Sequence, residues 1–316
     1  MAADTYQANF NRRWGHLTQP HVRALAWLLD APDLLDPDDP HWEGRIASLG
    51  VLPAAIDAWL ARIDHDPSGL TAELGERVYT RLGLYAEKLM AFYYREHGML
   101  VAHGLQVRAA RNDTVGEFDF LLDAGSDALE HIEFATKFYL LEGEAASRFD
   151  TFVGPNLADS LGAKMRKIFD KQLALGSHPA AQAVLPRPVV RARALVKGWL
   201  FYPAGAGAHM DGISAQHCRG FWCPAADIER LDDDAFVVLP RLQWLAPYRG
   251  SAQDRQVQSR VQLHDLLAAQ FDTLPMPVLV AAVKEEEGAL VETARGFIVP
   301  NDWRARAAFR QQLIPK

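Results

Sequence analysis

Four charged side chains on two short segments of this 316-residue chain could carry out metal-dependent chemistry. Glu117 and Asp119 lie in the segment GEFDFLL, and Glu133 and Lys137 lie in the segment HIEFATKF that follows it. Mg²⁺ and Mn²⁺ prefer carboxylate oxygens, and Mg²⁺ usually leaves part of its shell to water and substrate phosphate. Such a cation polarises a phosphodiester and supplies a hydroxide nucleophile, while a nearby lysine offsets the developing negative charge.

Two neighbouring strands would have to position these side chains. The segments 117–122 and 129–141 are rich in aromatic and β-branched residues, and the loop 123–127 predicts a hairpin between them. Neighbouring strands lie about 4.8 Å apart, so Asp119 and Glu133 could share one cation. Glu117 is either a third acid of this site or an ordinary surface charge.

The alternation of residues along these strands predicts two faces for each of them. In the first strand, one face takes Phe118, Phe120 and Leu122. In the second, the apolar face takes Ile132, Phe134, Thr136, Phe138 and Leu140, and the other takes His131, Glu133, Ala135, Lys137 and Tyr139. The alternative is that Glu133 and Lys137 are ordinary surface charges on the solvated face of an edge strand.

Helices and further strands complete an α/β unit. Apolar residues at helical spacing predict a helix over 76–97, ended by Gly98, with Glu87 off the apolar stripe. A strand over 99–110 precedes the hairpin, a helix is expected over 157–175, and a strand over 189–202. The predicted order over 76–202 is therefore helix, three strands, helix, strand.

This pattern resembles the PD-(D/E)xK superfamily of phosphodiesterases, which includes many restriction and repair nucleases. The resemblance implies a restriction-endonuclease-like core in which Glu87, Asp119 and Glu133 hold Mg²⁺ or Mn²⁺. The Gly-Glu-Phe-Asp run also resembles the Gly-Glu-Ile-Asp signature of small resolvase-like nucleases. More narrowly, the whole chain resembles a bacterial family of unknown function grouped with this superfamily, including the stretches Arg219-Gly220-Phe221-Trp222 and Arg295-Gly296-Phe297.

One position departs from the superfamily pattern. Ala135 stands where the lysine of the motif is expected, and Lys137 follows two residues later on the same face. Lys137 is about 13 Å from Glu133 along the strand, against about 7 Å for the usual spacing. Either Lys137 is a migrated catalytic lysine that stabilises the transition state, or the chain has lost hydrolysis and is a nucleic-acid-binding module. An interaction protein of unknown function is the third reading.

A basic run favours nucleic acid, DNA or RNA, as the partner. Residues 159–200 carry an excess of six positive charges. We expect a path for the phosphate backbone along Lys164, Lys167, Lys171, Arg191 and Arg193. The alternative is a solvated helix and an edge strand protected by charge.

Composition and charge narrow the class of protein. The net charge of −7 argues against a protein that coats nucleic acid non-specifically, but not against a confined site. No apolar run is long enough for a membrane span, and the two cysteines form no disulfide framework, so we expect a cytoplasmic protein. The predicted organisation is a helical N-terminal arm (1–75), the core (76–202) and a C-terminal α+β extension packed on it (203–316).

Overall fold

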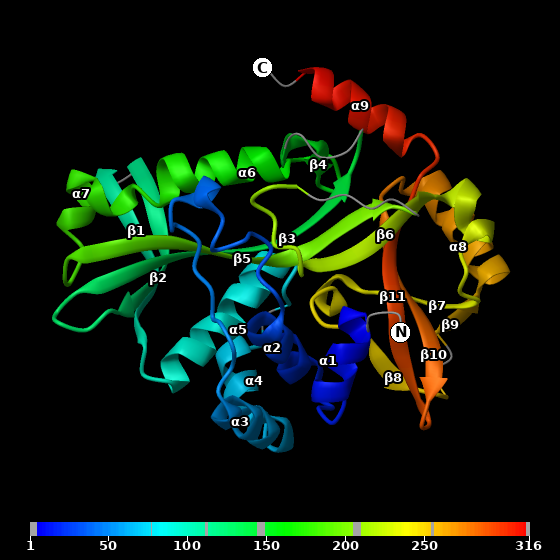
Figure 1. Cartoon of the computed structure of the whole chain (residues 1–316), viewed down its shortest axis with the longest axis horizontal. Helices are drawn as coiled ribbons and strands as arrows, with labels where there is room; N and C mark the ends of the chain where they lie inside the picture. Colours follow the sequence, from blue (N-terminus) through cyan, green and yellow to red (C-terminus); the bar gives the residue numbers. More distant parts are fainter. Residues whose placement is uncertain are drawn as a thin grey trace.

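The computed structural model has a mixed α/β fold built on one large sheet, which confirms the predicted fold class. It describes residues 5–76, 78–110, 113–143, 149–204, 210–253 and 256–313. Within these residues the sheet has 11 strands, and nine of them follow the order β1-β2-β3-β5-β6-β11-β10-β7-β9. Figure 1 shows the sheet running through the whole molecule, with helices on both sides.

The first half of the sheet contains the predicted core strands. Its members are β1 (Leu100–Ala110), β2 (Asp113–Asp123), β3 (Leu129–Leu141), β4 (Phe152–Val153) and β5 (Val189–Pro203). The strands β1, β2 and β3 are antiparallel neighbours, and β5 runs parallel to β3. The predicted hairpin between β2 and β3 is thus confirmed. Because β3 lies between β2 and β5, it is a central strand, which excludes the solvated edge-strand reading of Glu133 and Lys137.

The second half of the sheet continues without a break from the first. It contains β6 (Cys218–Pro224), β7 (Ala235–Val238), β8 (Arg249–Ser251), β9 (Val257–Ser259), β10 (Val278–Glu286) and β11 (Ala289–Val299). Strand β6 joins the halves through parallel pairs with both β5 and β11. Strands β10 and β11 form a hairpin across Glu287 and Gly288, which both have positive φ, as a tight two-residue turn requires. The sheet therefore continues across residue 202, where the sequence predicted the boundary between the core and the C-terminal extension.

Helices from the N-terminal section cover one face of the sheet. They are α1 (Tyr6–Trp14), α2 (Pro20–Asp30), α3 (Ala54–His65), α4 (Ser68–Leu74) and α5 (Leu82–Glu96). Their apolar side chains form one cluster with residues of β2, β3, β5, β10 and β11. Helix α5 ends as predicted: Gly98 has a φ of +67°, and the Met99 N–H closes back on the Tyr94 carbonyl at 2.9 Å. No helix in the described parts of the chain is both long and apolar enough to cross a membrane.

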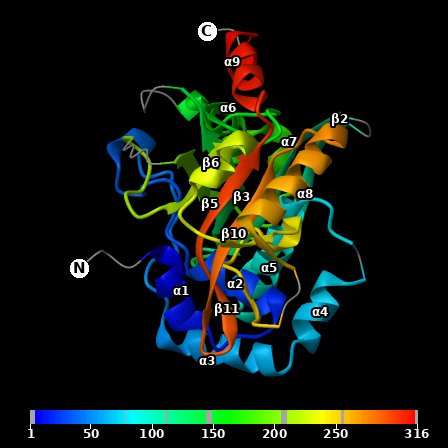
Figure 2. The same ribbon diagram turned by 90° about the vertical axis from the view of Figure 1, so that its right-hand side faces the viewer.

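The opposite face is covered by α6 (Leu161–Lys167), α7 (Pro179–Gln182) and α8 (Arg260–Thr273). Figure 2 shows the sheet from its C-terminal side, with α8 in front of it and α9 (Trp303–Leu313) at the C-terminal end. Short 3-10 turns lie at Pro40–Trp42, Phe149–Thr151, Leu175–Ser177, Ala225–Arg230 and Arg241–Gln243. The prediction of a single long helix over 157–175 is wrong. The observed helix α6 starts at Leu161, after the N-cap Ser160, and a π-helical turn over Ile168–Gln172 follows it.

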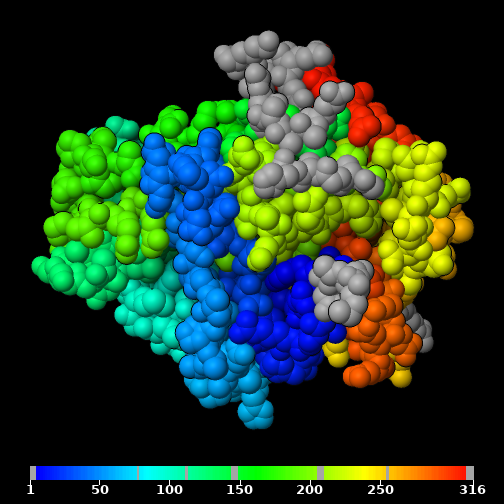
Figure 3. Space-filling view, in the orientation of Figure 1, coloured from blue at the N-terminus to red at the C-terminus, as the bar shows by residue number. Residues whose placement is uncertain are grey.

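The N-terminal section also crosses to the α6 face. Figure 3 shows it, in blue, running up the front of the molecule beside the green residues of α6 and α7. Trp42 and Ile46 pack in the same apolar cluster as α6, and Ala194 of β5 exchanges backbone hydrogen bonds with Arg45 and Ala47 at 2.8–2.9 Å. The segment therefore covers the part of β5 that has no β6 partner, and it belongs to the core packing.

The predicted faces of β3 are confirmed, and one prediction for β2 is wrong. Ala135 and Tyr139 pack on the α6 side, whereas Ile132 and Phe134 pack on the α5 side. In β2, Phe120 and Leu122 face α5, but Phe118 packs with Leu121 in a different cluster. The alternation of β2 therefore breaks at Asp119, which lies between Phe118 and Phe120.

Candidate metal centre

The site lies where β2 and β3 separate. Paired residues run from Asp123↔Leu129 to Phe120↔Ile132, and the pairing stops there. Beyond that point the Phe134 backbone N–H donates to Asp119 Oδ2 at 2.9 Å. The Asp119 carboxylate thus satisfies a backbone group that the separating strand leaves without a partner. The break in the alternation of β2 and the opening of the sheet coincide at this residue.

Glu133 faces this opening from β3 and is almost fully buried, with 1% of its surface exposed. Burial, and next the negative charge of Asp119, raise the pKa of Glu133 to about 8, although Lys164 opposes the shift. Burial also raises the pKa of Asp119 to about 6, with a further contribution from Glu87. The two carboxyl groups therefore interact, and repulsion between their negative charges favours the state in which one of them is neutral.

Two side chains from the α6 segment contact the Glu133 carboxyl group. Lys164 Nζ lies 3.8 Å from Glu133 Oε1, and Gln172 Nε2 donates a hydrogen bond to the same oxygen. Lys164 also donates to Gln172 Oε1 at 3.3 Å. In a regular α-helix two residues eight positions apart point about 80° apart, since each residue turns the helix by about 100°. The π-helical turn widens the helix by one residue, which brings Gln172 back to the side of Lys164.

The remaining acids form a second group beside Asp119. Carboxylate oxygens of Glu87, Glu117 and Asp119 all lie within 4.8 Å of one another. Glu87 comes from α5, accepts a hydrogen bond from His103 Nε2 of β1 at 2.7 Å, and is partly buried. Glu117 is exposed and accepts a hydrogen bond from Gln106 Nε2 at 3.2 Å. The structure therefore groups two of the three predicted metal ligands, Glu87 and Asp119, with Glu117, whereas Glu133 is not a member of this group.

Lys137 lies on the same face of β3 but has a different partner. Its ammonium is 3.8 Å from Asp159 Oδ2, and Tyr139 donates to that same oxygen at 2.9 Å. Burial, followed by the like charge of Lys164, lowers the pKa of Lys137. The cation nearest to Glu133 Oε1 is consequently Lys164, which the sequence assigns to phosphate binding.

Most of the predicted basic path is engaged in local ion pairs. Arg191 and Arg193 pair with Glu130 of β3 at 3.0 and 2.6 Å. Lys167 and Lys171 are exposed on the α6 segment. Within the predicted path, Lys164 of the α6 segment is the residue with a contact to an acid of the site.

Two site residues were not identified from the sequence, His103 and His131. His131 lies two residues before Glu133 on the same face of β3, so the period of two could have identified it. His103 meets Glu87 through the packing of α5 on β1, and neither residue's local sequence shows this contact.

Comparison with known proteins identifies one family. A family described as "Domain of unknown function (DUF1853)" matches residues 23–299, which include every residue of the site. No curated protein and no solved structure matches the chain. The match covers most of the sequence, so the chain belongs to the DUF1853 family.

Proposed function

We propose that this protein is a metal-dependent nuclease that hydrolyses phosphodiester bonds in DNA or RNA. The observation that carries the proposal is the position of Asp119 and Glu133 at the opening between β2 and β3, where burial raises the pKa of both carboxyl groups and the charge of Asp119 raises that of Glu133 further. Two neighbouring carboxyl groups that are largely buried repel each other when both are ionised, and protonation of one of them relieves that repulsion. A divalent cation would relieve it more completely, since it allows both groups to be ionised.

The donor set fits Mg²⁺ or Mn²⁺. Asp119 and Glu133 would hold the cation, with Glu87 as a further ligand or as the residue that positions water. When bound, the cation supplies Lewis-acid polarisation of the scissile phosphate and acidifies the attacking water. Glu133 is oriented by Gln172, and the Lys164 ammonium lies close enough to the acids to offset negative charge on the phosphate. Lys137, on the same face of β3 as Glu133, would add positive charge beside Lys164.

The exposed lysines of the α6 segment would bind the phosphate backbone that leads to the site. Lys167 and Lys171 are free to do so from the surface. Arg191 and Arg193 would first have to release Glu130, so we expect them to contribute less. The element order and the positions of Glu87 on α5, Asp119 on β2 and Glu133 on β3 support a place in the PD-(D/E)xK superfamily.

An assay of cleavage tests the proposal. Wild-type protein is incubated with single-stranded and duplex DNA and RNA and with Mg²⁺ or Mn²⁺, beside Asp119→Ala and Glu133→Ala. We expect cleavage by the wild type and a loss of at least about 100-fold in each variant. Activity that survives in both variants would refute the assignment of the site.

The second candidate is a nucleic-acid-binding module without hydrolysis. It is favoured by Ala135 in the motif and by the pairing of Lys137 with Asp159 instead of an acid of the site. Calorimetry separates the two functions. Tight binding of nucleic acid without binding of Mg²⁺ or Mn²⁺ would favour the module, and binding of both would favour the nuclease.

A further inference from the structure

His131 is a buried imidazole without a hydrogen bond. It is 0% exposed, and neither Nδ1 nor Nε2 has a hydrogen-bond partner among the described residues. Its ring packs edge-on against Phe118, at 4.8 Å between centroids. Buried polar atoms nearly always have a partner, so two unpartnered nitrogens on one ring call for a specific explanation.

The imidazole faces a carboxylate oxygen that is also without a donor. Glu133 Oε2 has no hydrogen-bond partner within the described parts of the chain, whereas Oε1 accepts from Gln172. His131 Nε2 lies 3.9 Å from this oxygen. That distance is too long for a hydrogen bond. A neutral imidazole offers one ring nitrogen as a lone-pair donor to a metal ion.

A single cation can bridge a gap of this size. Ligand nitrogen and oxygen atoms lie about 2.0–2.2 Å from a first-row metal ion, so two of them on one ion are at most about 4.4 Å apart. The observed 3.9 Å falls within that limit. Asp119 interacts with Glu133, and its carboxylate would turn toward the ion to supply the next oxygen.

We propose that His131 is a nitrogen ligand of the metal held by Glu133 and Asp119, and that the site prefers a first-row transition ion to Mg²⁺. The inference rests on the proposed metal centre and specifies which metal it takes. Imidazole nitrogen binds transition ions well, whereas Mg²⁺ favours oxygen alone. We expect Mn²⁺ to bind at least about 10-fold more tightly than Mg²⁺.

Pulsed electron paramagnetic resonance of the Mn²⁺-loaded full chain tests the ligand directly, without reference to activity. Wild-type protein should show electron spin-echo modulation from a directly coordinated ¹⁴N nucleus, and labelling with ¹⁵N should replace it. His131→Leu should abolish the modulation and weaken Mn²⁺ at least about 10-fold while changing Mg²⁺ less than about threefold. His264→Leu, at an exposed position on α8, is the control and should match the wild type.

The outcomes separate this inference from the proposed function. Bound Mn²⁺ without nitrogen modulation, or modulation that persists in His131→Leu, would overturn the role of His131 and leave the acid-pair site standing. If calorimetry finds no binding of Mn²⁺ or Mg²⁺, the metal centre itself fails. If His131→Leu does not fold, a wild-type spectrum without nitrogen modulation still overturns the inference.

Discussion

Asp119 and Glu133 hold their protons more tightly in the folded chain than carboxylic acids do in water. Their pKa values are raised to about 6 and about 8, chiefly by burial. A raised carboxyl pKa means that folding favours the neutral form. A metal ion binds the ionised carboxylates and must displace the protons that these groups hold. We therefore expect the affinity for Mn²⁺ to rise between pH 6 and pH 8.

The same shift predicts how stability depends on pH in the metal-free protein. The unfolded chain releases the Glu133 proton near its ordinary pKa of about 4.3, and the folded chain retains it up to about pH 8. The neutral carboxyl therefore stabilises the fold below the unfolded pKa, and this contribution is lost as pH rises through 8. Since Glu133→Gln cannot ionise, it should gain stability relative to wild type by up to about 1.4 kcal/mol per pH unit.

Urea unfolding of the metal-free proteins between pH 5 and pH 9 measures this difference. Glu229→Gln, at an exposed position, is the matched control and should parallel the wild type. Parallel pH profiles for wild type and Glu133→Gln would contradict the burial argument.

The two lysines on this face should differ in their effect on cleavage. Lys164 Nζ is 3.8 Å from Glu133 Oε1, whereas Lys137 Nζ is 3.8 Å from Asp159 Oδ2. Lys164→Met should therefore slow single-turnover cleavage at least about 10-fold, and Lys137→Met less than about threefold. The exposed Lys171→Met should weaken nucleic-acid binding and reduce its salt slope by about one, with little effect on the cleavage step. The opposite order for Lys164 and Lys137 would return Lys137 to the catalytic position.

At the scale of elements, the close contact between β3 and β5 fixes the position of the β3 face that carries Glu133 and Lys137. Gly198 pairs with Lys137 across these strands, and a Cβ atom at this position would lie 2.0 Å from the Lys137 carbonyl oxygen. Both strands are central, so neither can move aside without disturbing its other neighbour.

Gly198→Ala should therefore destabilise the fold by about 2–3 kcal/mol. Gly83→Ala is the control, because an added Cβ at this position of α5 meets nothing within 4 Å. Alanine is a better helix former than glycine, so the control should be neutral or stabilised by up to about 1 kcal/mol. Denaturant unfolding checks both variants, and equal stabilities would contradict the close packing of β3 on β5.

The sequence predicted regular elements well and their interruptions poorly. The bounds of β3, its two faces and the hairpin to β2 follow from alternation and turn chemistry, which are local. The break of alternation at Asp119 depends on tertiary contacts, because the side chain replaces a strand partner for Phe134. The π-helical turn is likewise set by what Lys164 and Gln172 contact, not by the intrinsic preference of residues 168–172.

The proximity of the two acids Asp119 and Glu133 could be predicted from the sequence, whereas the lysine that contacts Glu133 could not. Asp119 and Glu133 share a hairpin whose register a short turn fixes, so their proximity follows from sequence. Lys164 reaches Glu133 from a separate segment, across a distance that no local pattern encodes. The position of the N-terminal section was also unpredictable, because Arg45 and Ala47 bond to β5 about 150 residues away in the sequence.

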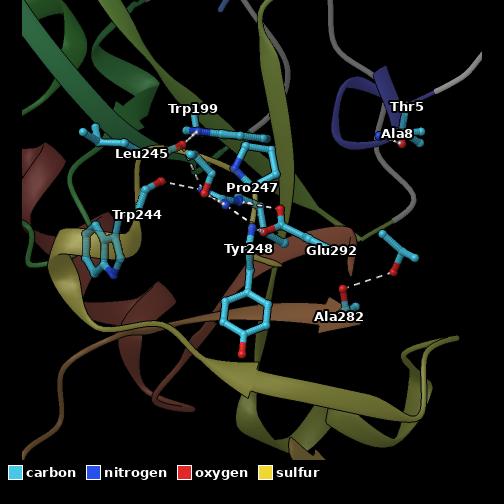
Figure 4. Close-up of polar contacts among 12 residues, drawn as sticks. Thr5, Ala8, Trp199, Trp244, Leu245, Pro247, Tyr248, Ala282 and Glu292 are labelled. Carbon is cyan, nitrogen blue, oxygen red and sulfur yellow. Dashed lines mark hydrogen bonds and ion pairs between the residues drawn. The ribbon is translucent and has the colours of Figure 1, made fainter. Parts of the chain in front are cut away.

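At the scale of the whole molecule, buried arginines tie the N-terminal helices to the C-terminal strands. Arg295 of β11 is fully buried, pairs with Glu292 at 2.6 Å, and donates to the carbonyls of Trp244 and Ala246. The two carbonyl groups belong to the loop 244–248, whose surroundings are shown in Figure 4. There the Tyr248 N–H donates to Glu292 at 2.7 Å, and the Trp199 side chain donates to the Leu245 carbonyl at 3.0 Å.

A second buried arginine donates a hydrogen bond to the same loop. Arg23 of α2 donates to the Pro247 carbonyl at 2.9 Å and to the Trp14 carbonyl at 3.0 Å. The loop 244–248 is therefore fixed between the helical layer and the sheet, with its carbonyl groups satisfied by charged donors. These contacts join the section 1–75 to the section 203–316.

Arg295→Met should destabilise the protein by about 3–5 kcal/mol, because it leaves the Glu292 carboxylate buried without its cation. Arg230→Met removes an exposed partner of Asp227 and should change stability by less than about 1 kcal/mol. Thermal and urea unfolding measure both. Equal effects of the two substitutions would show that the buried pair does not hold the loop.

The central claim is that Asp119 and Glu133 act as one metal-binding unit in phosphodiester hydrolysis. The most direct measurement is the metal-dependent cleavage rate of wild type, Asp119→Asn, Glu133→Gln and the double variant. Residues that act as a unit give non-additive losses, so the double variant should lose no more activity than either single variant, about 100-fold or more. Cleavage that persists in the double variant, or losses that simply multiply, would contradict the claim.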